Sequence, residues 1–191
     1  MAEPSLDALL ARIEEEVLGR PAPEGMATKI VAVDGLAGSG KSTFARHLAR
    51  ALGGATVIPT DDFASWDDPV DWWPKLVERL LVPLSRGEAA CYEKSHWGGP
   101  TDGQPVTFEP AGLLVLEGVT ASREAFAPYL TYAIWIESPP ELRLRRGLDR
   151  DGEDALSQWR EWMDVEEEYR RREKPDERAD LVIHGDRDLW T

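Results

Sequence analysis

The stretch GLAGSGKS, residues 35–42, decides the fold of this chain. It fits the pattern G-x-x-x-x-G-K-[ST], in which successive backbone N–H groups turn inward and cradle phosphate oxygens. The apolar run TKIVAV (28–33) before it predicts a short strand, and KSTFARHLARAL (41–52) after it predicts a helix. This strand–loop–helix order is the context that the motif requires. We therefore expect a phosphate-binding loop rather than an ordinary glycine-rich turn.

The residues of this loop have separate expected roles. Lys41 is expected to reach the β- and γ-phosphates of a nucleotide, and the Ser42 hydroxyl is expected to bind Mg²⁺. The positive end of the following helix adds to the anion site. The predicted ATP-binding residues are Gly35, Ala37, Gly38, Ser39, Gly40, Lys41, Ser42 and Thr43.

Further strands follow along the chain. ATVIP (55–59), LLVLEG (113–118), TYAIWI (131–136) and DLVIH (180–184) are short and apolar, as strands of a sheet buried on both faces are. With 28–33 they make five strands that alternate with helices. This order predicts a three-layer α/β P-loop NTPase fold, with a five-stranded parallel sheet and helices on both faces.

Helices are expected at 5–18, with Ser5 as its cap, and at 76–87. Two more, about 140–150 and 155–172, would form a helical arginine-rich lid. Residues 88–110 are rich in Gly and Pro and are expected to be irregular. A length of 191 residues suits a single domain over 1–191.

The composition excludes several partners. Asp and Glu total 36 against 22 Lys and Arg, and the net charge of −14 repels nucleic acids and anionic membranes. The single cysteine, Cys91, suits a reducing compartment, and neither a signal peptide nor an apolar run of membrane length is visible. We expect a cytoplasmic protein that acts on a small molecule. The sequence leaves its oligomeric state open, and a homo-oligomer is compatible with it.

Acidic residues follow two of the predicted strands. Asp61 and Asp62 come directly after 55–59, and Glu117 ends 113–118. The carboxyl ends of parallel strands meet at one edge of the sheet, where ligands bind. Kinase chemistry needs one acid beside Mg²⁺ and another that accepts the proton of the attacking hydroxyl. The chain has no N-K-x-D guanine motif, and its size favours a compact kinase over a motor ATPase.

TDDF (60–63), WDDP (66–69), LLVLEG, the arginine-rich helix and ADLVI (179–183), in this order, resemble the uridine kinase (uridine–cytidine kinase) family. Phosphoribulokinase and bacterial pantothenate kinase are more distant relatives. The resemblance covers about residues 28–185. It implies an ATP- and Mg²⁺-dependent kinase that transfers the γ-phosphate to a hydroxyl, most typically the 5′-hydroxyl of uridine or cytidine.

The resemblance also implies residue roles. Asp61 matches the general base and also lies on the metal side, with Asp62 as the alternative base and a simple turn cap as the structural alternative. Glu117 matches a magnesium-side acid, together with Ser42. Asp67 matches a sugar-binding Asp, unless it only forms an Asp-Pro turn.

Tyr92 and His96 of the YEKSH segment (92–96) match nucleobase contacts, but the segment is one residue shorter than in the family. Ala64 stands where the family has Tyr, and the loop between DDF and WDDP is short. These departures lie on the acceptor side. A pantothenate-like or sugar acceptor therefore stays open as an alternative, as does an ATP-binding module without catalysis.

The basic helix ELRLRRGLDRD (141–151) places Arg143, Arg146 and Arg150 at i, i+3 and i+7 on one face. The resemblance places a lid here. Arg146 and Arg150 are expected to stabilise the transferred phosphoryl group, and Arg143 is expected to bind substrate. The alternative is a solvated face paired with neighbouring acids. The apolar stripe of the next helix, which includes Trp159, is expected to pack beneath this lid.

Overall fold

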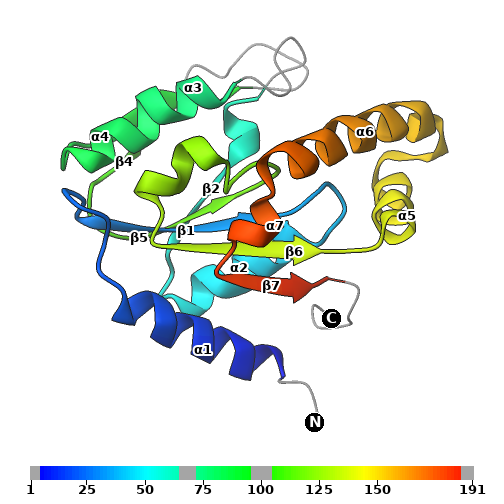
Figure 1. Ribbon diagram of the computed structural model, residues 1–191. Coiled ribbons are helices and arrows are strands. Elements are labelled where there is room, and N and C mark those ends of the chain that lie inside the picture. The colour runs from blue at the N-terminus through cyan, green and yellow to red at the C-terminus, as the bar shows by residue number, and fades with distance from the viewer. Residues whose placement is uncertain (1–4, 65–71, 96–104, 186–191) are drawn as a thin grey trace.

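The computed structural model describes residues 5–64, 72–95 and 105–185, and a five-stranded sheet lies at its centre (Figure 1). The strand order is β2 (Thr56–Pro59), β5 (Gly112–Glu117), β1 (Thr28–Asp34), β6 (Tyr132–Glu137) and β7 (Leu181–His184). All neighbours in this order are parallel. The prediction of a five-stranded parallel α/β sheet is confirmed.

The pleat of β1 divides the core into two layers. Ile30 and Ala32 belong to one hydrophobic cluster, whereas Val31 and Val33 belong to the other. Successive side chains of a strand point to opposite faces, so a strand covered on both faces is apolar throughout. This is why the sequence of the strand lacks polar alternation.

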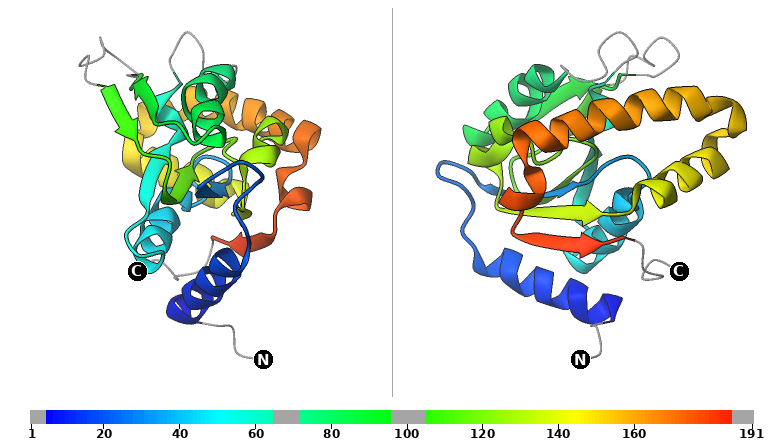
Figure 2. Two further views of the ribbon diagram at one scale, coloured as in Figure 1. Left: turned by 90° about the vertical axis from the view of Figure 1, so that its left-hand side faces the viewer. Right: turned by 45° about the vertical axis from the view of Figure 1, so that its right-hand side comes forward.

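One layer is built by α1 (Leu6–Gly19) and α2 (Lys41–Ala51), which lie on the same side of the sheet (Figures 1 and 2). Ile13 and Val17 of α1 pack with Phe44 and Leu48 of α2. Ser5 caps α1 as predicted, since its hydroxyl oxygen accepts a hydrogen bond from the Ala8 amide at 3.3 Å. This layer supports the helix that follows the phosphate-binding loop.

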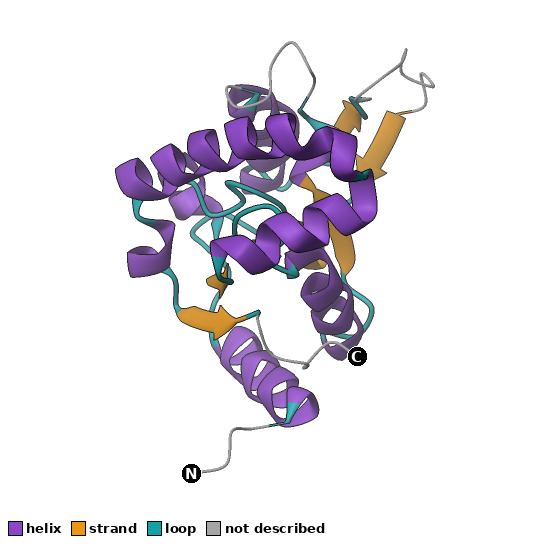
Figure 3. Ribbon diagram, turned by 90° about the vertical axis from the view of Figure 1, so that its right-hand side faces the viewer, coloured by secondary structure: helices purple, strands orange, loops and turns teal. Residues whose placement is uncertain are grey.

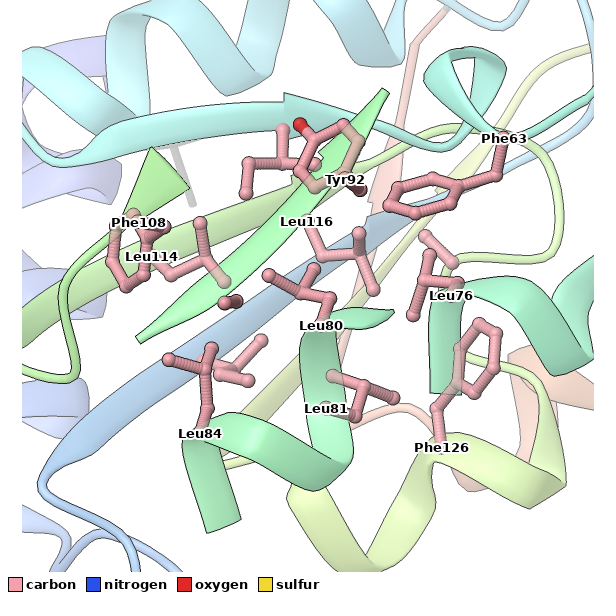
Figure 4. Packing of buried hydrophobic residues seen from close by; sticks show 14 of the residues in the cluster. Phe63, Leu76, Leu80, Leu81, Leu84, Tyr92, Phe108, Leu114, Leu116 and Phe126 are labelled. Carbon is pink, nitrogen blue, oxygen red and sulfur yellow. The ribbon is translucent and has the colours of Figure 1, made fainter. Parts of the chain in front are cut away.

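The other layer contains the helical segment 73–85, made of α3 (Trp73–Leu76), the π-helical turn η2 (Val77–Leu81) and α4 (Val82–Ser85). Its leucines pack against β5, as Figure 4 shows for Leu80 and Leu114. The turn widens just before Pro83, which has no N–H to donate and whose ring would crowd the carbonyl one turn earlier. The helix predicted at 76–87 is therefore present but begins at Trp73.

The same layer includes two elements that the sequence analysis missed. A hairpin of β3 (Ala90–Glu93) and β4 (Pro105–Phe108) occupies part of the stretch 88–110, so the expectation of irregular structure there is wrong for these residues. Ala90 and Tyr92 are buried and their neighbours are exposed, which is the alternation of a strand. The sequence did not reveal this short alternation because the surrounding stretch is rich in Gly and Pro. A 3₁₀ segment, η3 (Glu124–Tyr129), follows β5.

Two long helices lie in front of the carboxyl edge of the sheet (Figure 3). They are α5 (Pro140–Asp151) and α6 (Leu156–Glu173), joined by the short η4 (Glu153–Ala155), and α7 (Pro175–Arg178) leads on to β7. Both long helices were predicted within a few residues. At their contact, a Cβ atom at Gly147 would overlap the Trp159 ring.

In the described part of the chain, every helix is too short or too polar to cross a bilayer.

Candidate active site

The loop 35–42 links β1 to α2 and runs beneath α5. Gly38 and Gly40 have left-handed φ angles of +76° and +96°, which turn the backbone so that N–H groups face inward. A Cβ atom at Gly38 would lie 2.5 Å from the carbonyl oxygen of Arg143, so the close approach of α5 also requires glycine there. The predicted strand–loop–helix unit is present.

Asp34, at the end of β1, is a fully buried carboxylate at the root of this loop. Its two oxygens accept hydrogen bonds from the amides of Gly35, Thr120 and Ser122 and from the hydroxyls of Ser122 and Tyr169, at 2.7–2.9 Å. Burial raises the pKa of Asp34, and the hydrogen bonds oppose that shift. The residue therefore ties the loop to the segment after β5 and to α6.

Ser42 and Glu117 meet at the mouth of the loop. The Ser42 hydroxyl donates to the Glu117 carboxylate at 2.8 Å. Burial raises the pKa of Glu117, the charge of Lys41 and the Ser42 bond oppose the shift, and the negative charge of Asp61 adds to it. Hydroxyl and carboxylate oxygens are the ligands that Mg²⁺ prefers, so these residues fit a magnesium ion.

Asp61 and Asp62 lie in one 3₁₀ turn, η1 (Thr60–Asp62), but face different surroundings. Asp61 is exposed and lines a cavity at the carboxyl edge of the sheet. Asp62 is buried, accepts a 3.0 Å hydrogen bond from the Tyr92 hydroxyl and lies 3.3 Å from the Lys94 ammonium group. Of the two candidate bases, Asp61 is the one that faces the cavity.

This cavity has a volume of about 870 Å³ and lies between the loop 35–42, the ends of β2 and β5, and the α5–α6 pair. Its size is within the range of small-molecule sites. Most of the predicted site residues line it: Ala37, Gly38, Gly40, Lys41, Ser42, Thr43, Asp61, Glu117, Arg146 and Arg150. Gly35 and Ser39 belong to the same loop but are not among the lining residues.

Arg146 and Arg150, the two arginines of α5 that line the cavity, are held by protein groups. Arg146 donates to the Gly38 carbonyl at 3.2 Å and to the Gly185 carbonyl at 2.9 Å, so it braces the loop against the end of β7. Arg150 makes two 2.8 Å hydrogen bonds to Asp151 and lies over the Trp159 ring. The hydrogen bonds to Asp151 and the negative charges of Asp151 and Asp61, which both line the cavity, raise the pKa of Arg150.

The structure places two predicted substrate contacts away from the cavity lining. Arg143 is buried with its Nη1 atom 3.5 Å from Glu166, because the start of α5 is pressed against the loop. Tyr92 is buried against Phe63, with ring centroids 4.5 Å apart, and its hydroxyl bonds to Asp62. Asp67 and His96, the other two predicted acceptor contacts, lie outside the described residues.

Several residues around the cavity were missed by the sequence analysis. Glu166 reaches the loop from α6, where its carboxylate accepts a 2.9 Å hydrogen bond from the Ala37 amide. Trp162 and Tyr169, which belong to the apolar stripe expected to pack beneath the arginine-rich helix, line the cavity as well. Trp72, for which packing and pocket lining were both open, is a lining residue too. An acid at the end of an apolar strand could have drawn attention to Asp34. Glu166 carries no such signal, because it is one of three consecutive glutamates.

Comparisons with known proteins agree with this architecture. A curated relative, the cytidylate kinase of Pyrobaculum arsenaticum (strain DSM 13514 / JCM 11321 / PZ6), is 29% identical over 143 residues, which cover 75% of this chain and 72% of the relative. A solved structure described as a possible uridine kinase, from Bacillus stearothermophilus, is 18% identical with a TM-score of 0.67, over 93% of this chain and 98% of that one.

A second solved structure, a candidate fructose transport system kinase from Silicibacter sp. TM1040, is 22% identical with a TM-score of 0.62, over 91% of this chain and 98% of that one. At these identities the two structures show a shared fold, which is the P-loop kinase fold. A family model described as an AAA domain matches residues 31–176, which begin within β1 and include the loop 35–42, α5 and α6. The chain therefore belongs to this AAA domain family.

Proposed function

We propose that this protein is an ATP-dependent kinase that transfers the γ-phosphate to a hydroxyl group of a small molecule, with a pyrimidine nucleoside as the first candidate acceptor. One observation carries the proposal. Lys41 and Ser42 of the loop, Glu117 of β5 and the exposed Asp61 line the same cavity. A phosphate cradle, a pair of metal-binding oxygens and a free carboxylate are the groups that phosphoryl transfer uses.

The chain's own residues would act by positioning and electrostatics. The amides of the loop and Lys41 would hold the triphosphate, and Asp61 would accept the proton of the attacking hydroxyl. Arg146 and Arg150 would stabilise charge that develops on the transferred group. Ser42 and Glu117 would hold Mg²⁺, which would neutralise charge on the phosphates when bound.

The distribution of cations favours an uncharged acceptor. The cations among the described lining residues are Lys41, Arg146 and Arg150, and all of them belong to the loop or to α5. The segments that the resemblance assigns to the acceptor side are WDDP (66–69) and YEKSH (92–96). Their one Lys or Arg is Lys94, whose ammonium group lies 3.3 Å from the Asp62 carboxylate. A nucleoside suits this chemistry better than a nucleotide, whose own phosphate would need a cation. A sugar is the second candidate, favoured by the likeness to the candidate fructose transport system kinase.

The test is a screen for ATP consumption with nucleosides, cytidylate, pantothenate and sugars as acceptors, in which the Asp61→Asn variant serves as the blank. We expect uridine or cytidine to be phosphorylated and cytidylate to be a poor acceptor. Turnover of a sugar or pantothenate with inert nucleosides would change the acceptor class. Full activity in Lys41→Ala would contradict the donor site itself.

A further inference from the structure

The loop 35–42 contacts an anion that belongs to the protein itself, the carboxylate of Glu166. The Oε2 atom of Glu166 accepts the 2.9 Å hydrogen bond from the Ala37 amide and lies 3.5 Å from Nη1 of Arg143. Glu166 lies in the middle of α6 and reaches the loop from there. Its side chain is only 12% exposed. A backbone amide of this loop is a group that binds phosphate in such sites.

The surroundings of Glu166 are those of an anion site. Lys41 from α2, the Ala37 amide from the loop and Arg143 from α5 all favour its charged form, whereas Asp34 from β1 disfavours it. Burial acts in the opposite direction to the cations and raises the pKa of Glu166. Two cations and an amide therefore converge on a position that a carboxylate now fills.

The carboxylate does not use all the donors of this position. Within the described residues, the Nε and Nη1 atoms of Arg143 have no hydrogen-bond acceptor, although the side chain is 4% exposed. Buried guanidinium donors without acceptors are costly. A phosphate group offers more oxygens and more charge than a carboxylate, so it can satisfy donors that Glu166 leaves unpaired.

We propose that Glu166 is an internal competitor of the nucleotide, which sets the affinity of the loop for polyphosphate. The inference rests on the proposed function in one respect, since it requires that the loop binds a polyphosphate. A bound polyphosphate takes over the Ala37 amide and the nearby cations and expels the carboxylate. Because Trp162 and Val165 on the same helix line the cavity, expulsion of Glu166 also moves part of the wall that an acceptor would touch.

The test is calorimetric titration of Glu166→Gln with Mg-ATP and, separately, with inorganic tripolyphosphate. The amide oxygen of Gln still accepts from Ala37, so the fold is maintained while the competing charge is removed. We expect both ligands to bind about tenfold more tightly than to the wild type, a gain of about 1.4 kcal/mol. The matched control is Glu167→Gln, which removes the same charge from the same helix at a side chain that is 56% exposed, and should bind as the wild type does.

The outcomes separate the two proposals. If wild type and variants bind neither ligand, both this inference and the proposed donor site fall. If the wild type binds but Glu166→Gln binds no more tightly than Glu167→Gln, or more weakly, only the competitor role is overturned. A gain for Mg-ATP without a gain for tripolyphosphate also overturns it, because competition for the phosphate site does not depend on the nucleoside.

A second measurement uses the wild type alone and does not depend on the folding of a variant. Hydrogen–deuterium exchange of the α6 peptide that contains Glu166 is compared with and without saturating tripolyphosphate. Loss of the bond to Ala37 should leave this part of α6 less restrained, so we expect faster exchange with the ligand. Unchanged or slower exchange would overturn the inference.

Discussion

At the scale of single residues, Asp61 and Asp62 are adjacent in sequence but differ in surroundings, and this difference makes the base assignment testable. Asp61→Asn should leave ATP affinity nearly unchanged and reduce turnover by about 10² to 10⁴, the range for loss of a general base. Asp62→Asn should mainly reduce stability, because the Asp62 carboxylate is buried and accepts a hydrogen bond from the Tyr92 hydroxyl. Steady-state kinetics and ATP titration of both variants check this. A turnover loss confined to Asp62→Asn would reverse the assignment.

The buried Asp34 gives a second prediction at the residue scale. Tyr169→Phe removes one hydroxyl donor, at 2.7 Å, from a carboxylate that has no access to water. A hydrogen bond to a charged group contributes about 1.5–3 kcal/mol, so we expect a loss of that size in the free energy of unfolding. Tyr132→Phe is the comparison, since its hydroxyl bonds to Glu16, whose side chain is 34% exposed, and should contribute less. Urea denaturation measures both, and equal losses would contradict the special role of Asp34.

At the scale of elements, the packing of α5 on α6 decides where Arg146 and Arg150 lie. A Cβ atom at Gly147 would overlap the Trp159 ring, so Gly147→Ala should force the helices apart and cost about 1–3 kcal/mol of stability. The activity should fall as well, because Arg146 and Arg150 lie on the displaced helix. Gly19→Ala, at the open end of α1, is the control and should be neutral or slightly stabilising. Thermal unfolding and activity assays of both variants measure these effects. If the two variants had the same stability and activity, the prediction would be wrong.

At the scale of the whole molecule, buried carboxyl groups and net charge both make the folded state less stable as the pH rises. Burial raises the pKa values of Asp34, Glu117 and Glu166, so the folded state holds these protons more tightly than the unfolded state. The protonated groups therefore stabilise the folded state. This stabilisation is fully present below the ordinary carboxyl pKa values and is lost as the pH rises through the raised pKa values of the folded state. Self-repulsion from a net charge of −14 also grows with pH.

We therefore expect a higher melting temperature at about pH 5.5 than at about pH 8, at constant ionic strength. Glu16 and Asp151 have lowered pKa values, and their contribution is lost only as the pH falls through those lowered values, below this window. Differential scanning calorimetry of dilute protein at the two pH values measures the difference. A higher melting temperature at the alkaline value would show that the buried carboxyls do not control the pH dependence.

The sequence by itself determined the sheet, the loop and ten of the residues that line the cavity. Buried strands are apolar along their whole length, and the loop 35–42 is a contiguous motif, so both are written in local patterns. Asp61 and Glu117 could be placed at the site because the ends of parallel strands share an edge. The hairpin β3–β4 could not be predicted, since β3 is buried only at alternate residues and the hairpin lies in a stretch rich in Gly and Pro.

Only the tertiary structure decided which of several similar side chains serve the site. Arg143, Arg146 and Arg150 share one helical face in sequence, yet the approach of α5 to Gly38 buries the first and leaves the other two at the cavity. Glu166 and Tyr169 reach the loop and Asp34 from more than 120 residues away. Contacts of that range depend on how helices pack, and the packing is set by volumes and angles that no local pattern encodes.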